Sequence, residues 1–311
     1  MIEVVRKNRK DTLRLVMSRK MIDQASGLRE LAAMQARDSV KVFTVAGGKT
    51  GVGKTSIVVN LATALAKIGN RILILDENQH HNNVSANLGV KSHYDLVHLI
   101  KREQSLDQVL VKAPDDILVL TAARGIHSLT QLSAEEQESI IKCLCELPID
   151  VVLVDTMIGE MGHVLPFSLA SQQVLITVSG SSKSITDAYT LIKIMSQEYA
   201  RQDFLVIVNK VKSEPDAQSI YENIAKVAKQ HLTVRLEYLG CVLFDEKLHR
   251  ASQLCRSVVD AFPASTSAIE FKQLAEKLLR CSYSNQYSGG VDNFMYRLIR
   301  TSHLNKVKLS V

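Results

Sequence analysis

The sequence Gly-Lys-Thr-Gly-Val-Gly-Lys-Thr occupies residues 48–55 and matches in full the G-x-x-x-x-G-K-[ST] pattern of a phosphate-binding loop. It follows an apolar run at 42–45 and opens a stretch of helical periodicity at 54–68. Glycines let such a loop curl until its N–H groups point at phosphate oxygens, and the helix N-terminus adds positive potential. We therefore expect Lys54 to neutralise charge on the β- and γ-phosphates and the Thr55 hydroxyl to ligate Mg²⁺.

Further apolar runs follow the loop, alternating with longer helical patterns. They are continuous rather than alternating, as expected of strands covered on both faces. The predicted strands are 42–45, 72–75, 117–120, 151–154, 174–178, 204–208 and 239–242, and the later helices are 134–147, 184–199 and 214–231. The pattern predicts an α/β fold of the P-loop NTPase class, with a mostly parallel, twisted sheet of about seven or eight strands flanked by helices.

Two aspartates come directly after predicted strands. Asp155 follows 151–154 and Asp76 follows 72–75. Because ligands bind at the carboxyl ends of parallel strands, both carboxylates are expected at the Mg²⁺ site, and Gly159 would let the next loop sense the γ-phosphate. A helix-capping role is the alternative for Asp155.

Lys49 is a second lysine inside the loop, and here the sequence resembles the MinD/ParA family, whose loop is typically Lys-Gly-Gly-Val-Gly-Lys-Thr. The resemblance implies binding of ATP and Mg²⁺ and an ATP-dependent homodimer in which Lys49 reaches the partner's phosphates. Thr50 stands where the family usually has Gly, a departure that would shift the backbone locally.

A second departure concerns hydrolysis. The family commonly has Asp-x-Asp after the second strand, and its second Asp positions the attacking water; here the run is Asp76-Glu77-Asn78. The Asn78 amide can bind a water but cannot accept its proton. We therefore expect ATP binding with weak or absent hydrolysis. The side chain of Glu77 is expected to point to the opposite face of the extended backbone.

The base site is also inferred from the resemblance. In the family an Asn such as Asn209, after strand 204–208, reads the adenine, with a turn-forming Asn as the alternative, and Asp245 is expected beside the base. The predicted nucleotide-binding residues are Gly48, Lys49, Thr50, Gly51, Val52, Gly53, Lys54, Thr55, Ser56, Asn209 and Asp245. Those with catalytic roles are Lys49, Asp76 and Asn78, and the Mg²⁺ ligands are Thr55, Asp76 and Asp155.

Three segments are similar to one branch of the family, the flagellar-number regulators FlhG, also called FleN. They are the helix at 184–193, the segment at 132–137, and an N-terminal Asp-Gln-Ala-x-x-Leu-Arg signature. In that branch the signature helix contacts and stimulates an FlhF-like GTPase. The predicted partner-binding residues are Asp23, Gln24, Ala25, Leu28 and Arg29.

The two ends of the chain are more basic than its centre. The net charge is +6, and residues 1–20 carry seven Lys or Arg against two acidic residues. We expect a basic N-terminal segment (1–38, with Met21 as an alternative start), an ATPase domain (39–281), and a linker with a basic tail (282–311).

Apolar residues of the tail share one helical face, as an interfacial helix requires; they are Phe294, Met295, Leu298 and Ile299.

The family has a membrane-targeting helix at this position, so the resemblance implies a cytoplasmic protein attached peripherally to the inner membrane. Docking of the helix on its own core is the alternative. The chain has no apolar run of the ~20 residues that a membrane span needs and no signal peptide's apolar core.

The sequence is also compatible with other functions. One is a ParA-like partitioning ATPase that binds DNA, which the slightly acidic centre disfavours. Another is a diverged, non-hydrolysing paralogue. An iron protein of the nitrogenase type is excluded because no cysteine lies between residues 146 and 240, and an amide-forming synthase would need long insertions that we do not find.

Overall fold

The computed structural model describes residues 40–48, 51–78, 83–122, 125–157, 161–281 and 289–302, which fall in the unit Val40–Val311. Its strands are β1 (Lys41–Ala46), β2 (Ile72–Asp76), β3 (Val111–Lys112), β4 (Leu118–Thr121), β5 (Val151–Asp155), β6 (Gln173–Ser179), β7 (Asp203–Val211) and β8 (Arg235–Leu243). Its longer helices are α2 (Lys54–Lys67), α7 (Ala134–Cys145), α8 (Met161–Ala170), α9 (Ser182–Tyr199), α10 (Glu214–His231), α11 (Glu246–Gln253), α13 (Thr266–Arg280) and α14 (Val291–Ser302). The shorter ones are α3 (Val84–Asn87), α4 (Leu96–Ile100), α5 (Leu106–Val109), α6 (Gly125–Leu129), α12 (Val258–Ala261) and the 3₁₀ turn η1 (Pro114–Asp116).

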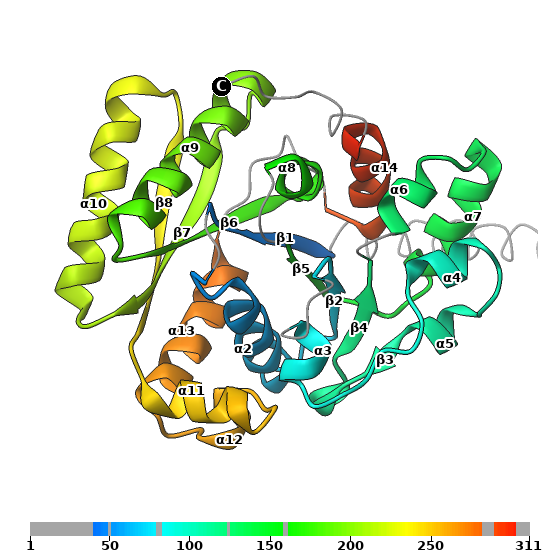
Figure 1. Ribbon diagram of the computed structural model, residues 1–311, viewed down its shortest axis with the longest axis horizontal. Coiled ribbons are helices and arrows are strands. Elements are labelled where there is room, and N and C mark those ends of the chain that lie inside the picture. The colour runs from blue at the N-terminus through cyan, green and yellow to red at the C-terminus, as the bar shows by residue number, and fades with distance from the viewer. Residues whose placement is uncertain are drawn as a thin grey trace, which may run out of the picture. The chain divides into compact units, whose positions relative to one another are not determined.

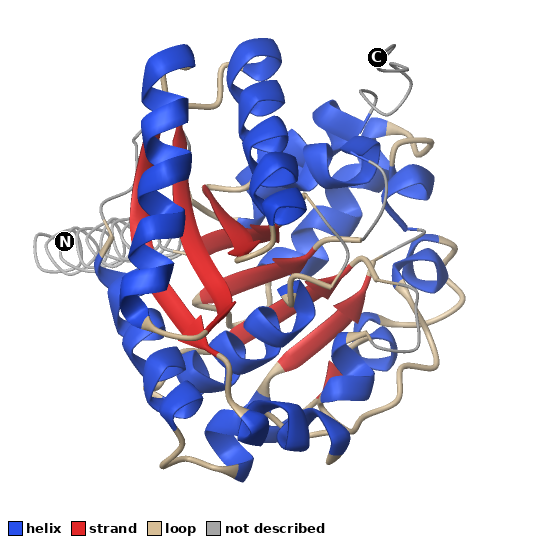
Figure 2. Ribbon diagram, turned by 60° about the vertical axis from the view of Figure 1, so that its left-hand side comes forward, coloured by secondary structure: helices blue, strands red, loops and turns tan. Residues whose placement is uncertain are grey.

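The strands form one eight-stranded sheet in the order β3-β4-β2-β5-β1-β6-β7-β8 within the described residues. Every neighbouring pair is parallel except β3 with β4. Figure 2 shows the twisted sheet with helices packed around it. The predicted fold class and all seven predicted strands are confirmed, whereas the edge strand β3 was not predicted.

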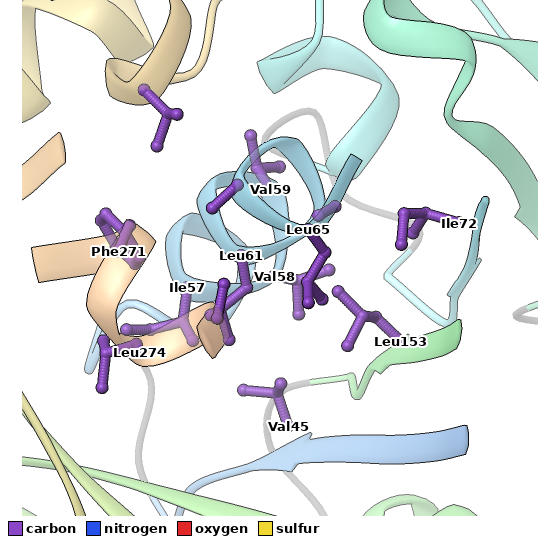
Figure 3. Packing of buried hydrophobic residues seen from close by; sticks show 14 of the residues in the cluster. Val45, Ile57, Val58, Val59, Leu61, Leu65, Ile72, Leu153, Phe271 and Leu274 are labelled. Atoms are coloured by element: carbon purple, nitrogen blue, oxygen red, sulfur yellow. The ribbon is translucent and has the colours of Figure 1, made fainter. Parts of the chain in front are cut away.

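Both faces of the strands are buried, as the continuous apolar runs indicated. In β1, Phe43 and Val45 join the core cluster on one face, whereas Val42 and Ala46 belong to clusters on the other. The first face is covered by α2 and α13 (Figure 1). Figure 3 shows Ile57, Leu61 and Leu274 packed between these two helices and the sheet. Helix α2 is therefore apolar around most of its circumference, as a fully buried helix must be.

The opposite face carries α8, α9, α10 and α14 (Figure 1). Helix α14 packs beside α8 with its apolar side inward, and Val291, Phe294, Met295, Leu298 and Ile299 are buried in the same cluster as strands β2 and β5. Residues 291–302 of the predicted tail thus form part of the core.

The sheet brings the loop after β1 together with the ends of two further strands. Val45 of β1 pairs with Asp155 of β5, and Asp155 pairs in turn with Asp76 of β2. Since these strands are parallel, their carboxyl ends meet at one edge of the sheet, which is where such folds bind ligands.

Candidate nucleotide-binding site

The loop between β1 and α2 has a backbone that requires glycine at several positions. Gly51 and Gly53 adopt positive φ angles of 79° and 96°, which residues with a Cβ rarely tolerate. A Cβ on Gly53 would collide with the amide of Asn209, and one on Gly48 would collide with the backbone of Asp187 in α9. The loop is therefore packed between β7 and α9. Lys49 and Thr50 lie outside the described residues.

Helix α2 begins at Lys54, and no side chain of the described residues caps its N-terminus. Its first N–H groups are thus available to an anion, which the helix dipole also favours. The Lys54 side chain is buried, with 5% of the residue exposed. Burial lowers the pKa of Lys54, and the nearby carboxylates of Asp155 and Glu77 oppose that shift. A buried cation beside an open helix start is the arrangement that a phosphate group needs.

Thr55 and Asp155 meet as the sequence predicted. The Thr55 hydroxyl donates to Asp155 Oδ2 at 2.6 Å. The other oxygen, Asp155 Oδ1, is buried and has no hydrogen-bond partner among the described residues. Burial raises the pKa of Asp155 to about 6, against the opposing effects of the Thr55 hydrogen bond and the Lys54 charge.

Asp76 lies beside Asp155 and holds the chain that follows β2. Its Oδ1 accepts from the N–H of Asn78 and its Oδ2 from the N–H of Val84, both at 2.9 Å. Burial, and next the charge of Asp155, raise the pKa of Asp76 to about 8. Asn78 is itself buried, with 3% exposed. Both of the predicted acidic positions are thus at the site, but the Asp76 carboxylate is already engaged by backbone donors.

The prediction that the Glu77 side chain points away from the site is wrong. Its Oε2 accepts from the N–H of Met157 at 3.0 Å, at the start of the loop after β5. Its charge also acts on Lys54, Asp155 and Asp76. The alternation of an extended strand does not hold here because Glu77 lies beyond the last residue of β2.

These residues fit a magnesium ion. Mg²⁺ is held by one or two carboxylates, a hydroxyl and the phosphates of its nucleotide rather than by an all-protein cage, and no group of three His, Cys, Asp or Glu side chains in the described chain forms such a cage. Asp155 offers a buried oxygen that has no hydrogen-bond partner in the described part of the chain, and Thr55 offers a hydroxyl next to it. Thr55 and Asp155 would hold the ion, with Asp76 next to them.

Asn209 was predicted to read the adenine. In the structure its amide is hydrogen-bonded to the loop between β1 and α2. Its Nδ2 donates to Val52 O at 2.8 Å, and its Oδ1 accepts from the N–H of Lys210 at 3.0 Å. Lys210 Nζ in turn donates to Gly51 O at 2.8 Å. The second N–H of Nδ2 and the second lone pair of Oδ1 could still pair with a base, so the adenine role of Asn209 stays a prediction. Sequence reasoning missed Lys210, whose left-handed backbone, with φ of 60°, is not encoded by any motif.

A cavity of about 800 Å³ extends from the start of α2 towards α11, and its lining includes Gly53, Ser56 and Lys210. Its size is in the range of small-molecule and cofactor pockets. Asp245 also lines this cavity, and its place beside the base stays a prediction. It caps α11 by accepting from the N–H of Lys247, and it also accepts from the N–H and hydroxyl of Ser267 in the first turn of α13.

The predicted membrane-facing side chains are all buried in the structure. Phe294, Met295, Leu298 and Ile299 pack into the core, and Phe294 lies against Phe167 of α8 with ring centroids 6.5 Å apart. Arg297 Nε donates to Ala170 O at 2.7 Å and fixes the helix further. This is the docked arrangement that the sequence analysis gave as the alternative. Within the described ranges, none of the helices combines the length and the apolar character that a membrane span needs.

The predicted partner-binding residues Asp23, Gln24, Ala25, Leu28 and Arg29 lie outside the described residues. The similar segment at 184–193 lies in α9, whose Asp187 packs against Gly48 of the phosphate loop. This part of the branch resemblance therefore falls on a helix that supports the site.

Comparison with known proteins agrees with this geometry. Residues 43–256 match the CobQ/CobB/MinD/ParA nucleotide binding domain. The chain is 34% identical over 269 residues to the antiactivator FleN of Pseudomonas aeruginosa, a match that covers 86% of this chain and 96% of FleN. It is 29% identical over 214 residues to the flagellum site-determining protein YlxH of Helicobacter pylori, covering 66% of this chain and 70% of YlxH.

Solved structures share the fold. MinD of Aquifex aeolicus, in its complex with MinC, has a TM-score of 0.63 at 24% identity, covering 78% of this chain and 97% of that one. MinD of Pyrococcus horikoshii, solved with Mg-ADP, has a TM-score of 0.61 at 19% identity, covering 78% of this chain and 96% of that one.

Proposed function

Since the chain belongs to the CobQ/CobB/MinD/ParA family of nucleotide-binding proteins and to its FleN-like branch, we propose that it is an ATP-dependent switch controlling the number or placement of flagella. Nucleotide binding is supported by the positions of Lys54, Thr55 and Asp155, which lie together at the start of α2. The flagellar part rests on the similarity to FleN and YlxH.

ATP and Mg²⁺ are the proposed ligands. Lys54 and the first N–H groups of α2 bind the phosphates, and Thr55 and Asp155 hold the metal, which neutralises phosphate charge when bound. The base enters the cavity beside Ser56 and Asp245. Two ATP-bound copies form a homodimer in which Lys49 of each reaches the phosphates of the other.

Hydrolysis is proposed to be slow. Asn78 replaces the family's second Asp, and its amide cannot take the proton of an attacking water. The bound state would therefore be long-lived, which suits a switch more than a rapidly turning-over enzyme.

Membrane attachment is proposed to require release of α14. Its apolar face is covered by the protein's own core, so the docked helix cannot enter a lipid surface. A single short amphipathic helix binds lipid weakly, and an ATP-driven dimer would present two. The N-terminal segment around Asp23 is the proposed contact for an FlhF-like GTPase.

The test is complementation of a FleN-deficient Pseudomonas aeruginosa strain, with flagella counted per cell. The wild-type chain should restore the parental number, Lys54→Ala should not, and the matched control Lys142→Ala, an exposed lysine of α7, should behave as wild type. Failure of a well-expressed, ATP-binding wild-type chain would overturn the flagellar role. Salt-dependent retention of nonspecific DNA with ATP would instead favour a ParA-like partitioning function.

A further inference from the structure

Two consecutive residues of β7, Asn209 and Lys210, both bond the loop between β1 and α2. Asn209 Nδ2 donates to Val52 O and Lys210 Nζ donates to Gly51 O, each at 2.8 Å. Consecutive side chains of a regular strand point to opposite faces of the sheet, so a regular β7 would not direct both towards one loop. The strand is irregular at this point.

The irregularity is a bulge at Lys210. The residues on either side of it, Asn209 and Val211, pair with two consecutive residues of β8, so Lys210 is the extra residue between two successive pairs. Its φ of 60° lies in the left-handed region, which residues with a Cβ seldom adopt. Bulges near binding sites redirect a side chain, and a strained backbone angle points to a local function. The bulge turns the Lys210 side chain towards the loop.

The two bonds fix the orientation of two peptide groups of the loop. A trans peptide is planar, and its C=O and N–H point in opposite directions; none of the described peptides is cis. Because Gly51 O is held on the side of β7, the N–H of Val52 is turned to the other side. Val52 O is held in the same way, which turns the N–H of Gly53 to that side as well. Successive N–H groups turned to one side form a concavity that binds anions.

We propose that Lys210 is a positioning residue for phosphate binding: its ammonium holds the peptide between Gly51 and Val52, and the loop binds phosphate groups more tightly as a result. This inference rests on the proposed function as a nucleotide-binding switch. Lys210 also lines the cavity that is proposed to receive the base, so the experiment has to separate an effect on the phosphates from a contact with the base.

Three substitutions are compared with the wild type. Lys210→Met keeps an apolar stem but removes the donor to Gly51 O. Lys210→Arg keeps a charged donor. Lys212→Met is the matched control, because Lys212 is an exposed lysine directly after β7 and is not among the described residues that line the cavity.

The experiment is displacement of a fluorescent ADP analogue in Mg²⁺ by two competitors, after circular dichroism has verified the fold. One competitor is the non-hydrolysable ATP analogue AMPPNP, and the other is tripolyphosphate, which has three linked phosphates but no base or ribose. Lys210→Met should weaken both by the same factor, about threefold to tenfold, which corresponds to the loss of one hydrogen bond. Lys210→Arg should recover most of the affinity, and Lys212→Met should match the wild type.

Salt separates positioning from direct attraction between the ammonium and the phosphates. Dissolved ions screen the attraction between exposed charges, whereas the orientation of a peptide does not depend on it. The loss in Lys210→Met should therefore be the same at low and at high concentrations of potassium chloride. A loss that disappears at high salt would show direct attraction and overturn the proposal.

The other outcomes are also distinct. A loss confined to AMPPNP would show that Lys210 contacts the base or the ribose, and an equal loss in Lys212→Met would show an effect of overall charge. Either result overturns the proposal, as does an unchanged affinity of Lys210→Met or a wild type that binds AMPPNP but not tripolyphosphate. If Lys210→Met does not fold, Lys210→Gly decides in the same way, since glycine readily adopts this φ angle. A wild type that binds neither competitor contradicts the proposed function itself.

Discussion

The hydroxyl of Thr55 donates to the carboxylate of Asp155 across 2.6 Å, although 100 positions separate the two residues in the chain. These are the two side chains proposed to hold Mg²⁺. They bind each other directly, so a bound ion would replace one existing hydrogen bond.

Thr55→Ala should weaken binding of Mg-ATP by at least about tenfold, because the hydroxyl is both a proposed metal ligand and the donor to Asp155. Thr55→Ser keeps the hydroxyl and should bind nearly as the wild type does. Titration with a fluorescent ATP analogue in Mg²⁺ measures this. Equal affinity of the Ala and Ser variants would mean that Thr55 is not at the metal.

The stability of the nucleotide-free protein should fall as the pH rises from about 5 to about 8. The folded state raises the pKa of Asp155 to about 6 and of Asp76 to about 8, both above the unfolded value of 3.8. In this window the folded chain therefore binds more protons than the unfolded chain, and rising pH favours unfolding. Urea unfolding in EDTA at several pH values measures the effect. Asp76→Asn should flatten the profile, and a wild-type stability that rises over this window would contradict the assignment.

Gly53→Ala should cost more stability than Gly69→Ala. Both glycines have nearly the same φ, 96° and 95°, so each substitution adds backbone strain of about 1–2 kcal/mol. No atom of the described residues lies within 4 Å of a Cβ on Gly69, but a Cβ on Gly53 displaces the Asn209 amide from Val52 O. The difference between the two variants' free energies of unfolding, from urea denaturation, gives the cost of losing that contact. Equal values would show that the Asn209 hydrogen bond does not stabilise the loop.

Asn78→Asp should raise the rate of ATP hydrolysis, by roughly 10²-fold if the new carboxylate acts as a general base. The rate of phosphate release in Mg-ATP measures this, with binding affinity as the control. Brisk turnover by the wild type, unchanged by the substitution, would show that Asn78 does not limit hydrolysis.

Phe294→Ala should destabilise the protein by about 3–5 kcal/mol, the range for truncating a fully buried aromatic side chain. Tyr296 lies on the outer side of the same helix with 47% exposed, and Tyr296→Ala should change stability by less than about 0.5 kcal/mol. Urea denaturation compares the two. Equal effects would mean that α14 does not dock in solution as it does in the structure.

Much of the fold was predictable from sequence because the strands are buried on both faces and read as uninterrupted apolar runs. Strand β3 was missed since it has two residues at the sheet edge, too few to carry a pattern. The loop at 48–55 could be predicted because a phosphate-binding backbone needs its glycines and its lysine at fixed spacings within a short stretch of sequence.

The site residues that sequence reasoning missed depend on distant partners. The position of the Glu77 side chain follows from Met157, 80 positions away, and that of Lys210 from Gly51, 159 positions away. For Asn209, the predicted contact with a base is untested, and the bond of its amide to Val52 O, which was not predicted, depends on how β7 packs against the loop. No local pattern encodes such contacts.

The most direct test of nucleotide binding at the loop is the affinity of the wild type and of Lys54→Ala for an ATP analogue in Mg²⁺, with Lys142→Ala as control. We predict tight binding by the wild type and the control, and a loss of at least about 10²-fold in Lys54→Ala, as expected when a buried charge-assisted contact is removed. Absence of binding by the wild type, or equal binding by Lys54→Ala, would contradict the proposed switch.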